Sequence, residues 1–155
     1  MSAPLTRLAD FMPYRLSVTS NAVSTVIAGE YRSRFGLKVP EWRVMAILGD
    51  TGSATQRELV AATKMDKVAV NRACKVLEHR GLVARSPNAR DGRSHHIELT
   101  VRGHAMHEEI MPLALDMEQR IFAPLATRER EQLRVILGKL LASVAALESR
   151  EGEGG

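Results

Sequence analysis

Two short helical segments separated by only a few residues are the feature that most restricts how this chain folds. Residues 55–63 begin with T-Q-R-E, the spacing of a capping box, which predicts the start of a helix. Asp66 is a favourable N-cap for a second helix, from Lys67 to about Arg80, which Gly81 is predicted to end. Two helices this short and this close together are typical of a helix-turn-helix.

After Gly81 the sequence pattern changes from helical spacing to alternation. Residues 82–85 and 96–99 are predicted to form two short strands around a polar run from Ser86 to His95, which indicates a β-hairpin. A helix-turn-helix followed by a basic hairpin is a winged helix. In that fold the second short helix enters the major groove of DNA, and the hairpin loop reaches phosphates or the adjacent minor groove.

Two further helices are predicted before this region. Apolar residues at steps of three and four from about Leu8 to Phe35 indicate a long first helix, with Pro13 in its first turns and Gly36 at its end. A second helix is predicted to open at Val39-Pro40-Glu41, and a loop at residues 49–53. The predicted fold class is therefore mainly α, a winged helix-turn-helix with long terminal helices.

The C-terminal third is also predicted to be helical. Thr100 caps a long helix that runs to about Leu125 and bends at Pro112, and Thr127 caps a last helix that is apolar at every third or fourth position. Such a small winged-helix body cannot cover both terminal helices, so a second copy of the chain is expected to do so. The alternative is that the terminal helices pack on each other within one chain.

These patterns divide the chain into one domain and a short tail. The domain covers residues 1–150, with dimerisation helices at about 7–36 and 101–148 and the winged helix-turn-helix at about 40–100; residues 151–155 are predicted to be a disordered tail.

Positive charge is concentrated in the winged-helix region. The chain carries 22 basic and 18 acidic residues, a net charge of +4. Residues 64–102 hold nine basic and four acidic residues, a net charge of +5, and the rest of the chain holds 13 basic and 14 acidic residues. A local basic excess on a nearly neutral body indicates a surface that binds polyanions, although a solvated face with incidental lysines is an alternative reading.

Candidate DNA contacts lie on the second short helix, away from its apolar stripe at residues 70, 73, 74 and 77. Asn71 and Arg72 can form paired hydrogen bonds with base edges, and the apolar Val68 and Ala69 can touch thymine methyl groups. Lysines at the ends of such a surface are better suited to phosphates, which position the protein without reading sequence. The full set on this segment is Lys64, Lys67, Val68, Ala69, Asn71, Arg72 and Lys75.

The hairpin loop adds three candidates. Arg90 and Arg93 flank Asp91 and Gly92 in the polar run. An arginine at the tip of a narrow loop is suited to the minor groove. We therefore include Arg90, Asp91 and Arg93 among the DNA-binding residues.

Other classes of protein are disfavoured. A single cysteine cannot form an internal disulfide and fits a reducing compartment. No apolar run approaches the roughly 18 residues of a membrane span, and the first residues lack the order of a signal peptide, so a cytoplasmic protein without a membrane partner is expected. No GxSxG, P-loop, HExxH or Rossmann glycine pattern is present, so we predict neither an enzyme nor a cofactor.

The cysteine and the histidines leave a sensing role as an alternative. Cys74 lies on the apolar stripe, where a structural role is favoured because free cysteines are commonly buried. His104 and His107 share a helix face with Glu108 nearby, but a full ligand set is not evident and no metal site is predicted.

The segment LVAATKMDKVAVNRACKVLEHRGLV, residues 59–83, resembles the MarR (multiple antibiotic resistance regulator) family of bacterial transcription regulators. Asp91, Gly92 and Arg93, followed by Leu99-Thr100 and Gly103, match that family's DxR…LTxxG signature, and the resemblance covers nearly the whole chain. It implies a homodimer with intertwined terminal helices and two winged helices on a pseudo-palindromic double-stranded DNA operator. It also implies that Arg93 enters the minor groove while Asp91 holds the wing.

The sequence departs from the family at the start of the second short helix. Val68 and Ala69 stand where members often have Ser and Thr. The base preference of relatives is therefore not carried over to this chain.

The resemblance further implies a small-molecule effector, because similar proteins commonly bind aromatic acids between the dimer helices and the DNA-binding lobe. Arg15 can pair with a carboxylate, while Tyr14 and Trp42 can stack on a ring. Phe11 and Trp42 can equally be hinge core. The segments LxxFMPYRL and PEWRV look similar to regulators of aromatic-acid catabolism, some of which respond to acyl-CoA thioesters. The candidate set is Phe11, Tyr14, Arg15, Trp42 and His104.

The leading hypothesis is a sequence-specific, ligand-responsive repressor that a small aromatic acid or its CoA thioester releases from DNA. Two alternatives are a metal- or oxidant-sensing regulator and a winged-helix protein-interaction module that binds DNA only weakly.

Overall fold

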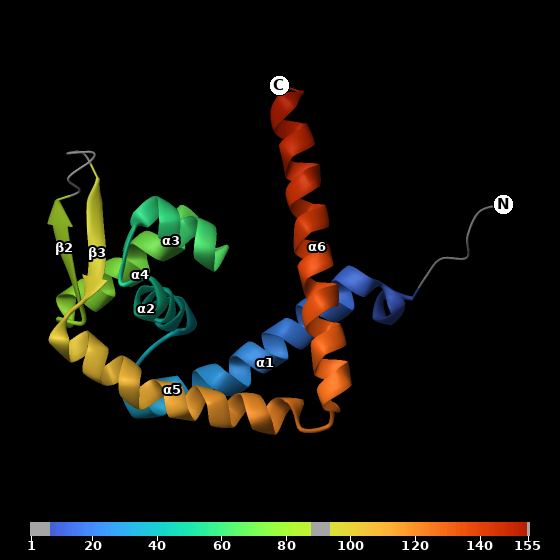
Figure 1. The fold of residues 1–155 in the computed structure, drawn as a ribbon, viewed down its shortest axis with the longest axis horizontal. Coiled ribbons are helices and arrows are strands. Elements are labelled where there is room, and N and C mark those ends of the chain that lie inside the picture. The colour runs from blue at the N-terminus through green and yellow to red at the C-terminus, as the bar shows by residue number, and fades with distance from the viewer. Residues whose placement is uncertain (1–6, 88–93, 155) are drawn as a thin grey trace. The chain divides into compact units, whose positions relative to one another are not determined.

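The computed structural model describes residues 7–87 and 94–154, and this part of the chain is mainly helical with one small sheet (Figure 1). The elements in chain order are η1 (Leu8–Asp10), α1 (Met12–Phe35), α2 (Val39–Thr51), β1 (Ser53–Thr55), α3 (Gln56–Thr63), α4 (Lys67–His79), β2 (Val83–Pro87), β3 (His95–Leu99), α5 (Val101–Phe122) and α6 (Thr127–Glu153). The chain divides into two compact units. The first ends at Leu115 and the second begins at Asp116, so the boundary lies inside α5.

The helix-turn-helix forms as the capping residues predict. The Thr55 hydroxyl oxygen accepts a hydrogen bond from the backbone N–H of Glu58 at 3.2 Å and begins α3. An Asp66 carboxylate oxygen accepts from the backbone N–H of Ala69 at 2.8 Å and begins α4. Gly81, at φ +73°, follows the end of α4, and the Leu82 N–H returns to the Leu77 carbonyl at 2.9 Å. The predicted helix-turn-helix is thereby confirmed.

The apolar stripe of α4 is buried in the hydrophobic core. Val70, Cys74 and Leu77 are fully covered, and Ala73 is 3% exposed, which confirms the apolar stripe read from the sequence. Figure 1 shows α2, α3 and α4 gathered on one side of the hairpin. Helices α2 and α3 and strand β2 pack against α4. The same core cluster contains Tyr31, Leu37, Val44, Met45, Leu48, Leu59, Leu82, Ile97 and Ile110.

The hairpin is confirmed and belongs to a sheet with one more strand than predicted. β2 pairs antiparallel with β3, with Val83 opposite Leu99 and Pro87 opposite His95. β1 pairs with the other edge of β3, giving the order β1-β3-β2. The sequence predicted a loop at residues 49–53, which is corrected here: α2 continues to Thr51, Gly52 follows at φ +82°, and β1 starts at Ser53. A three-residue strand is too short to reveal an alternating pattern.

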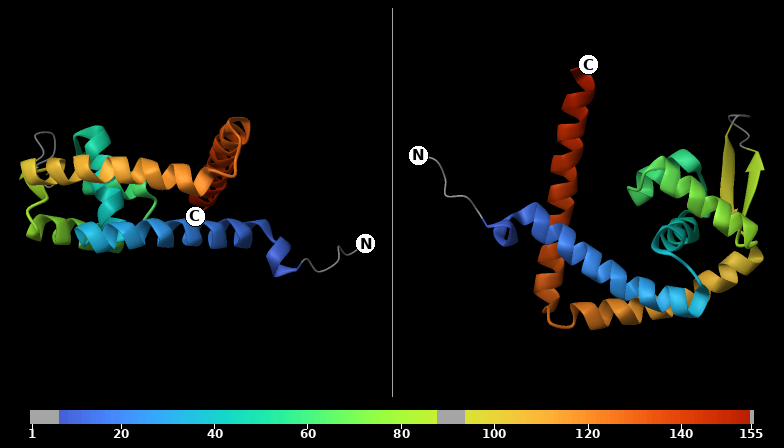
Figure 2. Two further views of the ribbon diagram at one scale, coloured as in Figure 1. Left: turned by 90° about the horizontal axis from the view of Figure 1, so that it is seen from below. Right: turned by 180° about the vertical axis from the view of Figure 1, so that it is seen from behind.

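The first helix begins later than predicted. Instead of one helix from Leu8, a separate 3-10 turn, η1, precedes α1, with Phe11 extended between them. Pro13 explains the break, because its nitrogen has no hydrogen to donate to the Ala9 carbonyl and its ring would clash with that group. The Arg15 guanidinium donates to the Ala9 carbonyl instead, at 3.1 Å. In Figure 2, η1 is set at an angle to the start of the long α1.

The C-terminal helices also differ from the prediction at their ends. Thr100 caps α5 as predicted, since its hydroxyl oxygen accepts from the Gly103 N–H at 3.0 Å, and α5 runs through Pro112 without ending there. Ala126, not Thr127, is the N-cap of α6. Glu129 allows this, because its carboxylate accepts from the Ala126 N–H at 2.9 Å and replaces a capping side chain.

The end of α6 extends further than expected. The helix continues to Glu153, into the segment 151–155 that was predicted to be a disordered tail. Within residues 7–87 and 94–154, no helix is long and apolar enough to cross a membrane.

Candidate nucleic-acid interface

The first two turns of α4 present a polar and basic surface to solvent. Lys67, Arg72 and Lys75 are exposed, and Val68 is 65% exposed between them. Ala69 and Asn71 are half-buried. Because Val70, Cys74 and Leu77 anchor the opposite side in the core, the exposed set has a fixed orientation relative to the body.

The turn before α4 positions a further lysine. Lys64 ends α3 in the left-handed region at φ 59°, the one non-glycine residue at positive φ within the described ranges. Its side chain is exposed. The left-handed region is sparsely populated by residues with a Cβ, so the surrounding turn must hold Lys64 in place. The Met65 N–H donates to the Thr63 hydroxyl at 3.3 Å and contributes to that turn.

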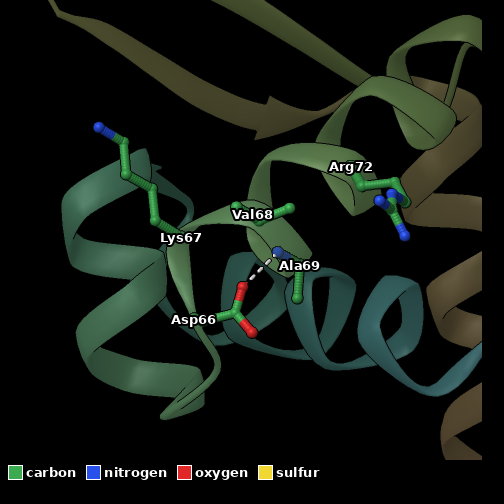
Figure 3. Close-up of a pocket in the computed structure, with 5 residues that line it drawn as sticks. All are labelled: Asp66, Lys67, Val68, Ala69 and Arg72. Atoms are coloured by element: carbon green, nitrogen blue, oxygen red, sulfur yellow. Dashed lines mark hydrogen bonds between the residues drawn. The ribbon is translucent and has the colours of Figure 1, made fainter.

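Residues at the start of α4 line an open surface depression, drawn in Figure 3. Asp66 lies at its edge with its carboxylate bonded to the Ala69 N–H, while Lys67 and Arg72 extend outward on either side of Val68. The depression therefore combines two cations with a central apolar contact. A cation pair suits phosphates or guanine acceptors, and an exposed valine suits a thymine methyl group.

The hairpin follows α4 in the chain, and β2 packs against α4. Arg90, Asp91 and Arg93 were predicted from the hairpin loop, and they lie outside the described residues. At the base of the hairpin, Arg85 on β2 donates from Nε to the Glu78 carboxylate on α4 at 2.8 Å. Sequence reasoning missed this ion pair. The two residues are seven positions apart across the turn at Gly81, and opposite charges at that distance carry no helical or strand signal.

The LTxxG segment joins the hairpin to α4 and α5. The Thr100 hydroxyl donates to the Gly81 carbonyl at 2.6 Å, and the Thr100 N–H donates to the Leu82 carbonyl at 3.0 Å. Gly103 is buried so closely against Leu82 that a Cβ there would overlap the Leu82 carbonyl oxygen. The glycine is thus required by the close approach of α5 to the end of α4.

Cys74 lies in the core, away from the exposed surface. Its side chain is fully covered, and this burial raises the pKa of the thiol; the Glu78 carboxylate adds to the rise and the Arg85 cation opposes it. A thiol of this kind is rarely ionised at neutral pH and reacts slowly with oxidants. The geometry fits the structural role that the sequence favoured.

The structure places the effector candidates at two separate positions. Phe11, Tyr14 and Arg15 are exposed at the start of α1. Trp42 on α2 packs against Tyr31, near the other end of α1, with ring centroids 4.9 Å apart. Tyr14 and Tyr31 are about 25 Å apart along the helix axis. One small ligand bound by a single chain cannot contact both positions.

A histidine that the effector prediction did not include lies beside Trp42. The His107 ring stacks on Trp42 with centroids 6.1 Å apart, and it fills the space next to Gly49, where a Cβ would overlap it. His104, the predicted candidate, is exposed one turn earlier. The spacing of His104 and His107 gave them one helix face, but only the packing of α5 against α2 distinguishes them. No group of three metal-ligating side chains is found in the described part of the chain.

Comparison with known proteins identifies the fold. The model of the MarR family matches residues 35–94. A solved structure of a probable transcriptional regulator from Pseudomonas aeruginosa is 30% identical, covers 86% of this chain and 99% of its own, and superposes with a TM-score of 0.77. The chain belongs to the MarR family. The predicted winged helix-turn-helix fold class is thereby confirmed.

Curated MarR-type relatives match over part of their length. The transcriptional repressor MprA of Escherichia coli (strain K12) is 31% identical over 59% of this chain and 52% of its own length. The repressor NicR of Pseudomonas putida is 30% identical over 64% of this chain and 63% of its own length. The matched region thus spans about half of MprA and less than two-thirds of NicR. Both relatives are named as regulators of transcription, not as enzymes.

The names of two similar solved structures include a bound or regulating molecule. A mutant MarR from E. coli, complexed with operator DNA, is 26% identical, covers 90% of this chain and 99% of its own, and has a TM-score of 0.76. BpsR of Bordetella bronchiseptica, whose DNA binding is regulated by 6-hydroxynicotinic acid, is 25% identical, covers 89% of this chain and 97% of its own, and has a TM-score of 0.81.

Proposed function

We propose that this chain is a transcriptional repressor that binds a DNA operator through α4 and the β2–β3 hairpin. The observation that carries the proposal is the exposed basic surface at the start of α4, held in one orientation by the buried stripe on its other side. The family supports it, since MprA is named as a repressor and a MarR structure contains operator DNA.

Each side chain of this surface has a proposed role. Arg72 and Asn71 read base edges, Val68 and Ala69 contact apolar groups in the major groove, and Lys67 serves either purpose. Lys64 and Lys75 bind phosphates and set the register. The proposed roles of Arg90, Asp91 and Arg93 rest on the sequence of the hairpin loop and, for Asp91 and Arg93, on the family resemblance.

We further propose that the protein acts as a homodimer on a pseudo-palindromic operator. α6 exposes seven large apolar side chains, and contiguous apolar surface of this extent is typical of protein–protein contact. They are Val135, Ile136, Leu137, Leu140, Leu141, Val144 and Leu147. A second copy is the occupant that gives two copies of α4, as recognition of a two-fold DNA site requires.

A small aromatic carboxylate, free or as its CoA thioester, is the proposed effector. The regulation of BpsR by 6-hydroxynicotinic acid supports an aromatic acid. Because the start of α1 and Trp42 are far apart in one chain, a ligand that contacts both needs the start of α1 from the second copy. Arg15 would then bind the carboxylate, and Trp42 would stack on the ring together with Tyr14.

The experiment that tests DNA binding is selection of genomic or random fragments by the purified protein, followed by affinity measurements on an enriched fragment. Arg72→Ala is expected to weaken operator binding by about tenfold, because a good base contact contributes roughly 1–3 kcal/mol. Arg128→Ala is the matched control, since it removes one exposed positive charge from the first turn of α6.

The outcomes separate the leading function from its rival. Enrichment of one sequence, with affinity that falls steeply as salt is added, supports the operator reader. No enriched sequence, or an Arg72→Ala variant that binds like wild type, contradicts it and favours a protein-interaction module. A panel of aromatic acids and their CoA thioesters then tests release from the enriched fragment, with Arg15→Ala and Trp42→Ala expected to lose the response.

A further inference from the structure

The last residue before Gly81 connects α4 to α1. Arg80 donates from Nη2 to the Phe35 carbonyl at 2.8 Å and from Nη1 to the Gly36 carbonyl at 3.2 Å. The two acceptors are consecutive carbonyls at the C-terminal end of α1. A planar guanidinium can bond both at once, which a flexible ammonium cannot do with the same geometry.

The end of α1 leaves these carbonyls available. Gly36 adopts the left-handed conformation at φ +64°, its N–H donates to the Arg32 carbonyl, and the Leu37 N–H donates to the Tyr31 carbonyl. The last carbonyls of a helix have no intrahelical partner, and a buried or half-buried one requires another donor. Arg80 is half-buried and supplies it.

The other side of the α4 terminus is attached to α5. Thr100 bonds the Gly81 and Leu82 carbonyls, directly after Arg80 in the chain. The C-terminal end of α4 is therefore held between two long helices, by a side chain from α4 itself toward α1 and by a side chain from the start of α5. Both helices lie in the predicted dimerisation region, residues 7–36 and 101–148, and α1 also carries the proposed effector residues Tyr14 and Arg15.

The position of Arg80 excludes a direct reading role. Arg80 lies about 20 Å along the helix axis from Lys67, at the opposite end of α4 from the surface in Figure 3. Both of its described donor contacts are to protein carbonyls. Its guanidinium is thus bonded to the end of α1 and does not face the exposed surface at the start of α4.

We propose that Arg80 is a positioning residue for operator binding: it fixes the orientation of α4 relative to α1, and so the orientation of the exposed basic surface at the start of α4. The proposal rests on the DNA-binding function proposed above. It adds a specific mechanical connection within one chain, between residues 35–36 and 80.

The first test compares Arg80→Met with Arg80→Lys, on an enriched DNA fragment and on DNA of unrelated sequence. Arg80→Met is expected to weaken specific binding about fivefold, the scale of residues that modulate coupling without touching the ligand. Binding to unrelated DNA and the salt dependence are expected to stay as in wild type, because no phosphate contact is lost. Arg80→Lys keeps the charge and one donor nitrogen, which can bond one of the two carbonyls, and is expected to recover part of the affinity.

Arg34→Met is the matched control. Arg34 is an exposed residue near the end of α1 whose side chain pairs with Glu30 at 3.3 Å, so its loss removes the same charge from the same region without touching α4. It is expected to leave the ratio of specific to unrelated binding unchanged. All measurements are made well below the midpoint of thermal unfolding, so that a loss of folded protein does not imitate a loss of specificity.

A second measurement, hydrogen exchange without DNA, keeps this proposal separate from the proposed function. Arg80→Met is expected to accelerate exchange at the Gly36 and Leu37 amides after α1 and at the Gly81 and Leu82 amides after α4. Unchanged exchange overturns the connection, whether or not the protein binds DNA. Accelerated exchange with specific affinity equal to wild type overturns the positioning role, and a reduced salt dependence reassigns Arg80 as a phosphate contact. If the wild type enriches no DNA sequence, the proposed function fails, and exchange still decides the connection.

Discussion

α4 and α6 are both amphipathic helices, but they differ in how far their apolar faces are exposed to solvent. In α4, Val70, Cys74 and Leu77 are fully covered by elements of the same chain. In α6, Leu140, Leu141 and Leu147 are 47%, 60% and 58% exposed. The side-chain types are alike, so the difference comes from what the chain supplies around each helix. Its own chain therefore makes α4 a core helix, whereas the uncovered apolar face of α6 is the observation on which the proposed homodimer rests.

The largest expected effect tests α6. Leu141→Glu is expected to convert the proposed homodimer to monomers and to abolish operator binding, because burying a carboxylate in an apolar contact is strongly unfavourable. Sedimentation velocity at micromolar concentration measures the change. Lys139→Glu, an exposed neighbour, is the control that introduces a carboxylate without removing an apolar group. A monomeric wild type would remove the basis of the comparison.

A smaller effect is expected in the core face of α4. Leu77→Ala is expected to lower the free energy of unfolding by about 2–5 kcal/mol, because it leaves a cavity under the helix. Val76→Ala, at a position 37% exposed on the same helix, is expected to cost less than about 1 kcal/mol. Urea unfolding measures both. Equal losses at the two positions would mean that the stripe is not the part of α4 that stabilises the fold.

Alanine substitutions at two glycines, one packed against the core and one on α6, are expected to change stability in opposite directions. Gly103→Ala is expected to cost roughly 1–3 kcal/mol, since its new methyl group would overlap the Leu82 carbonyl. At Gly138 in α6 nothing lies within 4 Å of a Cβ, so Gly138→Ala is expected to stabilise the helix by about 0.5–1 kcal/mol. Thermal unfolding reads out the sign. Destabilisation by Gly138→Ala would instead place that residue at the contact between copies.

The smallest expected effect is a pH dependence of the free energy of unfolding that comes from titratable groups in the core. Burial raises the pKa of Cys74 above its ordinary value of 9.0, so the folded state holds this proton more tightly than the unfolded state. That contribution to stability is complete below pH 9.0 and is lost as the pH rises above it. The pKa of Tyr31 is raised by burial from 10.0 and acts in the same direction.

Cys74→Ala checks this contribution. The variant is expected to lose less stability than wild type between neutral and alkaline pH, in unfolding experiments at matched ionic strength. Native protein at pH 7 is also expected to react slowly with a thiol reagent. Rapid labelling, or an unchanged pH profile in the variant, would contradict the buried and protonated thiol and reopen the oxidant-sensing alternative.

The helix-turn-helix could be predicted because its signals lie within a few residues of one another. The Thr55 and Asp66 caps, the apolar stripe of α4 and Gly81 each act over a few residues, and all were confirmed. Errors arose where a feature depends on partners distant in sequence or on competition between neighbours. β1 exists because β3 offers an edge, and Ala126 caps α6 because Glu129 takes the role expected of Thr127.

The candidate sites divide in the same way. The exposed residues of α4 follow from the helix period once the stripe is known. His107, Arg85 and Arg80 could not be assigned from spacing, because their partners Trp42, Glu78 and the end of α1 meet them only in the folded chain. Apolar periodicity in α6 predicted an amphipathic helix, but periodicity alone does not say whether the same chain or another covers its face.

The hairpin is closed at its base, so the stability of the fold depends on different residues from those in the segment that joins the two strands. Thr100, Gly81 and the Val83–Leu99 pair close the strands next to the core, on the side away from the segment that joins β2 to β3. Substitutions or changes of length in that joining segment therefore leave the anchored end of the hairpin intact. Under the proposed function, exchange of that segment alters sequence preference with little loss of stability, because the anchored end of the hairpin is built from other residues.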